Sequence, residues 1–171
     1  MRNYTKCDLY IKLKNKYIEH EHFIWRSDLL LNRLKENDHL FIDGTYHVPK
    51  DFLQVIIIMC YDKIINMNIP CIYIALNSKT EEAYNLCFSF IKKLLLNYSE
   101  EKEFITITTD NELALINSIK NNFKFKQRIS CYYHFKNNIE KKAREIGLKK
   151  ENYKDDTNKL LYFYLLINIK F

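Results

Sequence analysis

The sequence predicts an α/β protein built on a five-stranded mixed sheet of strand order 3-2-1-4-5, with helices on both faces. Three strand-like segments between residues 40 and 76 follow one another through short connections, as in an antiparallel meander. Two further strand-like segments, 104–110 and 127–133, each follow a segment with helical periodicity. Strands that alternate with helices are typically joined by crossover connections, and strands joined in this way run parallel to each other.

The composition is that of a globular protein without a membrane segment. Of the 171 residues, 47% are hydrophobic and 15% are aromatic. No apolar run approaches the roughly 20 residues that span a bilayer, and the first residues lack the apolar segment of a secretory signal. The five cysteines are odd in number and form no C-x-x-C pair, which favours a reducing compartment. We therefore expect a nuclear or cytoplasmic location.

Residues 1–39 are expected to be a helical lead-in to the main domain. Ser27 is a suitable N-cap for a short amphipathic helix that contains Leu31 and Leu34. At the other end of the chain, residues 155–169 are predicted to form a helix that is apolar nearly all the way round.

A carboxylate lies in the middle of the first predicted strand, 40–49. One face of this strand is formed by Leu40, Ile42, Gly44, Tyr46 and Val48. Asp43 falls on the other face, and Asp is depleted in strands. A structural explanation is a hairpin turn at Asp43-Gly44. The alternation continues beyond Gly44, however, so we favour a functional Asp43.

A second carboxylate, Asp110, ends the fourth predicted strand. In the order 3-2-1-4-5 the first and fourth strands are neighbours, so Asp43 and Asp110 can converge. Two nearby carboxylates repel each other unless a cation lies between them. Oxygen ligands on a rigid sheet suit Mg²⁺ or Mn²⁺, and a pair of such ions supports in-line phosphoryl transfer.

Several motifs in this order resemble those of one known family, over roughly residues 25 to 148. They are Asp43-Gly44-Thr45-Tyr46, Phe52-x-Gln54, Pro70 to Leu76, Lys79-Thr80 to Tyr84, Thr109-Asp110-Asn111-Glu112-x-Ala114 and Cys131-Tyr132-Tyr133-His134-Phe135. Together they are similar to the Mutator-like element (MULE) transposase domain, and the last is similar to its C-x-x-H motif. The resemblance implies a ribonuclease H-like fold over residues 40–150. It also implies a DDE transposase that cuts and joins DNA with Mg²⁺ or Mn²⁺.

The same resemblance implies that Asp43 and Asp110 are catalytic, metal-binding carboxylates. The implied partner is DNA, both transposon ends and target, and the full-length protein can be an oligomer. The family's third acidic residue is a Glu well beyond the C-x-x-H motif, whereas only 37 residues follow His134 here. We therefore expect a truncated copy that lacks this residue, with 151–171 as the start of a truncated helical region.

Three further residues have an open role. Glu112 belongs to the second acidic motif, which suggests a catalytic role. An equally good explanation is that it lies in the first turn of a helix, where an acidic side chain interacts favourably with the helix dipole. Cys131 and His134 suggest zinc, but a structural zinc needs four ligands and no second Cys/His pair is nearby. For His134 we prefer a contact with DNA or a role in stabilising the start of a helix.

A basic block lies between residues 120 and 151, with ten Lys or Arg against three Glu. It suggests a polyanionic partner, although a solvated helix face in a lysine-rich chain is an alternative. The residues expected to contact DNA phosphates are Lys136, Lys141, Lys142 and Arg144. The alternative function is therefore a non-catalytic, transposon-derived remnant that binds nucleic acid through this basic helix. Another ribonuclease H-like nuclease is disfavoured by the C-x-x-H motif.

Overall fold

The structure is a computed structural model that describes residues 7–14, 19–45, 48, 50–96 and 102–145. The chain divides into two compact units, Met1–Cys131 and Tyr132–Phe171, and each is described by itself. The first unit holds the sheet and helices α1 to α3, and the second holds α4. The predicted helix at 155–169 and the predicted domain boundary after residue 150 lie outside the described residues.

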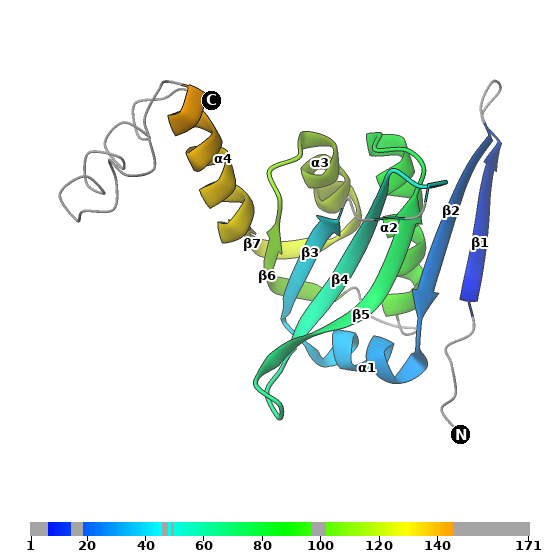
Figure 1. Cartoon of the computed structure of the whole chain (residues 1–171). Helices are drawn as coiled ribbons and strands as arrows, with labels where there is room; N and C mark the ends of the chain where they lie inside the picture. Colours follow the sequence, from blue (N-terminus) through cyan, green and yellow to red (C-terminus); the bar gives the residue numbers. More distant parts are fainter. Residues whose placement is uncertain (1–6, 15–18, 46–47, 49, 97–101, 146–171) are drawn as a thin grey trace. The chain divides into compact units, whose positions relative to one another are not determined.

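Among its described residues, the first unit has one sheet of seven strands in the order β1-β2-β5-β4-β3-β6-β7 (Figure 1). The strands are β1 Cys7–Lys14, β2 Glu19–Arg26, β3 His39–Thr45, β4 Gln54–Asp62, β5 Met67–Leu76, β6 Glu103–Thr109 and β7 Lys124–Ser130. In this spatial order, the neighbouring pairs β1–β2, β2–β5, β5–β4 and β4–β3 are antiparallel. The pairs β3–β6 and β6–β7 are parallel. The mixed α/β class is confirmed, and β4 runs against the other four predicted strands as expected.

The predicted strand order is incomplete, because the sheet has two strands more than the five predicted. The five predicted strands keep their relative order, but β2 adds antiparallel to β5 and β1 adds to β2. The description of residues 1–39 as a helical lead-in is therefore wrong for β1 and β2. Aromatic and β-branched residues such as Phe23, Ile24 and Trp25 favour strands. Pairing with β5 also satisfies backbone groups that would otherwise lie on an open edge.

The short amphipathic helix predicted to begin after Ser27 is confirmed as α1, Asp28–Glu36. Its N-cap is Ser27, whose hydroxyl accepts a hydrogen bond from the backbone N–H of Leu30 at 3.2 Å. Two predicted strands have different bounds in the structure. β3 is described as His39–Thr45, and its predicted end at residue 49 lies outside the described residues. β7 covers Lys124–Ser130 rather than 127–133, because α4 already begins at Tyr132.

The core of the first unit lies on one face of the sheet. Alternate residues of β4, namely Gln54, Ile56, Ile58 and Cys60, are buried. The apolar ones share a single cluster with residues of α1, α2 (Glu81–Leu95) and α3 (Leu113–Asn122). The described helices of this unit therefore pack on one face of the sheet, and the prediction of helices on both faces is not met by them. The fourth described helix, α4 (Tyr132–Glu145), belongs to the second unit.

Candidate active site

Asp43 and Asp110 lie at the carboxyl ends of neighbouring parallel strands. The parallel register of β3 and β6 pairs Ile42 with Thr109, and each aspartate is the next residue in the chain: Asp43 lies within β3, and Asp110 directly follows β6. Two segments that are 67 residues apart in the chain therefore bring one carboxylate each to the same edge of the sheet. The carboxyl edge of parallel strands is where α/β proteins commonly place their sites.

The alternation of buried residues places both carboxylates on the face of the sheet away from the core. Leu40, Ile42 and Thr109 are all buried, at 1%, 0% and 0% exposure, on the side of α2 and α3. Because successive side chains of a strand point to opposite faces, Asp43 and Asp110 belong to the other face. Both are half-buried.

Each carboxylate also accepts a hydrogen bond from the backbone of the following residue. Asp43 Oδ1 lies 2.9 Å from the N–H of Gly44, and Asp110 Oδ1 lies 2.6 Å from the N–H of Asn111. The alternative of a hairpin turn at Asp43-Gly44 is wrong, because both residues are paired within the β3–β4 ladder, opposite Ile57 and Ile56.

The residue after Asp110 connects the candidate site to the edge strand β7. Asn111 Oδ1 accepts a hydrogen bond from Ser130 Oγ at 2.8 Å and one from Arg128 at 3.2 Å. Sequence reasoning missed Arg128 and Ser130. The only signal was their spacing of two on one strand, and it acquires meaning once the β6–β7 register is known.

Glu112 is the N-cap residue of α3, but its side chain makes no capping hydrogen bond. Its Oε1 lies 2.8 Å from the hydroxyl of Tyr84, which is also 2.7 Å from Gln54 Oε1. Glu112 therefore precedes the first helical turn rather than lying in it. Its partner is the buried hydroxyl group of Tyr84, for which the sequence analysis predicted no functional role.

Cys131 lies beside the first carboxylate. Its Sγ is within 4.8 Å of a carboxylate oxygen of Asp43, and its N–H donates to the carbonyl oxygen of Thr109 at 2.8 Å. The thiol is free and half-buried. His134 belongs to the second unit, where its ring packs against Tyr133 with the ring centroids 5.6 Å apart.

The four cations predicted to bind DNA lie on α4 and are exposed. Lys136 is 3.8 Å from Glu140, and Lys142 is 3.1 Å from Glu145. Exposed pairs of this kind contribute little to stability, but they neutralise part of the positive field. Lys141 and Arg144 complete the set.

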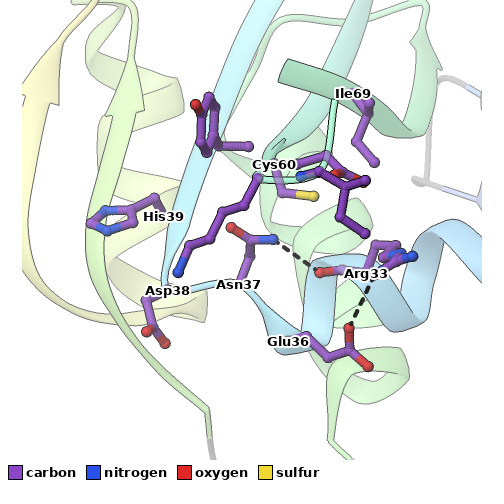
Figure 2. Close-up of a pocket in the computed structure, with 11 residues that line it drawn as sticks. Arg33, Glu36, Asn37, Asp38, His39, Cys60 and Ile69 are labelled. Carbon is purple, nitrogen blue, oxygen red and sulfur yellow. Dashed lines mark hydrogen bonds and ion pairs between the residues drawn. The ribbon is translucent and has the colours of Figure 1, made fainter. Parts of the chain in front are cut away.

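A pocket of about 240 Å³ opens at the other end of β3. Figure 2 shows Arg33 and Glu36 of α1 as an ion pair at its rim, with His39 at the start of β3. Its lining includes none of the predicted site residues. We therefore place the candidate site at the carboxyl edge and not in this pocket.

The fold and the site together define a class: a mixed α/β protein with two aspartates at the carboxyl ends of adjacent parallel strands. Residues 39–138, more than half of the chain, match the family model of the MULE transposase domain. The chain belongs to this family, so the resemblance found in its motifs is confirmed. No curated protein matches the chain significantly. Among the described residues, no helix has the length and apolar character needed to cross a membrane.

Proposed function

We propose that the chain carries the catalytic core of a DDE transposase with a ribonuclease H-like fold. In this proposal Asp43 and Asp110 hold divalent metal ions for the cleavage and joining of DNA. The observation that supports it is the register of β3 and β6, which pairs Ile42 with Thr109, the residues directly before Asp43 and Asp110. Membership of the MULE family supports transposition as the function of this site.

The donor set fits Mg²⁺ or Mn²⁺. Asp43 and Asp110 offer hard carboxylate oxygens, and a cation between them relieves the repulsion of two negative charges. The nearby Cys131 Sγ is a softer donor, which Mn²⁺ tolerates better than Mg²⁺. When bound, two such ions stabilise the attacking and leaving oxygens of phosphoryl transfer. The protein's part is to fix both carboxylates on a rigid sheet.

The proposed partner is DNA, the transposon ends and the target. The basic residues of α4 would contact its phosphates without reading sequence. Because Lys136 and Lys142 already pair with glutamates, Lys141 and Arg144 are expected to contribute most.

The test compares Mn²⁺ affinity and Mn²⁺-dependent nicking of supercoiled DNA in the unaltered chain and in Asp43→Asn and Asp110→Asn. Each substitution should weaken Mn²⁺ binding at least about tenfold, since a ligand charge is lost, and should abolish nicking. Asp38→Asn is the matched control: it removes an Asp at the opposite end of β3, paired with Lys102 at 3.2 Å. Its Mn²⁺ affinity should be unchanged.

Equal Mn²⁺ affinity in all four proteins would refute the metal site. If salt-sensitive DNA binding persisted without metal affinity or nicking, the alternative of a remnant that binds nucleic acid would be supported instead.

A further inference from the structure

Three side chains from separate segments meet directly behind the proposed metal edge. They are Gln54 at the start of β4, Tyr84 on α2 and Glu112 just before α3. Tyr84 is fully buried and Gln54 is only 2% exposed. Buried polar groups are costly unless they are satisfied, so this chain of contacts fixes the three segments relative to one another.

The direction of the hydrogen bonds follows from the number of hydrogens. A phenol has a single hydroxyl hydrogen, and a carboxylate can only accept. The single hydrogen of Tyr84 therefore faces two acceptors, Gln54 Oε1 at 2.7 Å and Glu112 Oε1 at 2.8 Å. The bond to Glu112 is the stronger one, because its acceptor is charged.

The chain of hydrogen bonds touches the backbone beside both proposed ligands. The Gln54 amide packs directly on Gly44, where a Cβ atom would lie only 1.9 Å from its nitrogen. Gly44 in turn donates its N–H to Asp43. At the other end Glu112 is two residues after Asp110. Because this contact lies on the core side of the sheet, Glu112 is directed away from the face that carries the aspartates.

We propose that Gln54, Tyr84 and Glu112 are positioning residues, and that Glu112 is committed to Tyr84 rather than to the metal. The chain holds Gly44 from one side and the segment Asp110–Glu112 from the other, and so sets the separation of the two carboxylates. This inference rests on the proposed function for its consequence, which is metal affinity. Its structural content is independent of any metal.

The discriminating experiment measures Mn²⁺ affinity in four variants. Tyr84→Phe and Glu112→Ala break the chain and should weaken Mn²⁺ binding about tenfold, as removal of a supporting group commonly does. Glu112→Gln keeps an acceptor for Tyr84 and should bind Mn²⁺ nearly as tightly as the unaltered protein. Tyr73→Phe, on a tyrosine that is 38% exposed, is the control for loss of a phenol and should have no effect. If Glu112 were a ligand, Gln and Ala would be equally damaging.

A second readout separates this inference from the proposed function. The amide signals of Gly44 and Asn111 in an NMR spectrum of the metal-free protein report the hydrogen bonds to Asp43 and Asp110. They should shift in Tyr84→Phe and Glu112→Ala and stay in place in Glu112→Gln and Tyr73→Phe. An unaltered protein without Mn²⁺ affinity would refute the metal site but leave this comparison valid. Unmoved signals in Tyr84→Phe would overturn the positioning role, as would shifts spread over the whole sheet.

Discussion

Gly44 is small for a reason of packing. It lies within the β3–β4 ladder, and a Cβ atom there would approach Gln54 Nε2 to 1.9 Å and Ile56 Cδ1 to 3.4 Å. The absence of a side chain therefore makes room for the buried amide of Gln54. At the scale of single residues, the Asp-Gly pair combines a carboxylate on one face of the sheet with a seat for Gln54 on the other.

Gly44→Ala is expected to lower the free energy of unfolding by about 1–3 kcal/mol, because the added methyl group must displace the Gln54 amide. Urea denaturation measures this loss. In a Gln54→Ala background the obstacle is gone, so the same substitution should cost far less. An equal cost in both backgrounds would show that Gln54 is not what excludes a side chain at position 44.

At the scale of elements, α2 and α3 are joined by a polar seam beside their apolar contact. Glu81 accepts hydrogen bonds from Asn117 at 3.0 Å and from Asn121 at 3.2 Å. Asn122 donates to Asn85 at 2.8 Å. Hydrogen bonds to a charged acceptor are stronger than neutral ones. The seam therefore fixes α3, and with it the loop that carries Asp110, against α2.

The seam can be tested with two neighbouring glutamates. Glu81 and Glu82 both lie in the first turn of α2, so both interact favourably with the helix dipole. Glu81 bonds to α3, whereas Glu82 is exposed. Glu81→Ala should therefore cost about 1–2 kcal/mol more than Glu82→Ala in the free energy of unfolding. Identical denaturation midpoints for the two variants would contradict a stabilising seam.

At the scale of the whole molecule, burial in the core raises the pKa of three cysteine thiols. Cys60, Cys71, Cys87 and Cys131 are free, and the first three of them are buried. Burial raises the pKa of Cys71 and of Cys87 from 9.0 to about 12, and it also raises the pKa of Cys60. The folded protein thus keeps these thiols protonated at pH values where the unfolded chain ionises them.

This difference makes stability depend on pH in the alkaline range. A folded pKa above the unfolded one contributes stability that is fully present below pH 9 and is lost as the pH rises toward 12. The free energy of unfolding should fall by up to about 1.4 kcal/mol per pH unit for each such thiol. Cys87→Ala should give a shallower slope than the unaltered protein in urea denaturation between pH 9 and 11. Parallel slopes would show that Cys87 does not carry this dependence.

The sequence by itself determined what depends on local pattern. Period-two and helical spacing placed β3 to β7 and α1 nearly correctly, because side-chain direction follows from the backbone repeat. The same patterns put Asp43 within a strand and Asp110 at a strand end. With the handedness and neighbour rules for crossovers, this was enough to predict that β3 and β6 are adjacent.

Only the tertiary structure decided the partners. Tyr84 meets Gln54 and Glu112 across 30 and 28 residues of chain, and Asn111 meets Ser130 across 19. Contacts of this kind depend on strand register and helix packing, which no local spacing encodes. The addition of β1 and β2 to the sheet was decided in the same way: a strand becomes part of a sheet only where a neighbour offers its unpaired backbone groups.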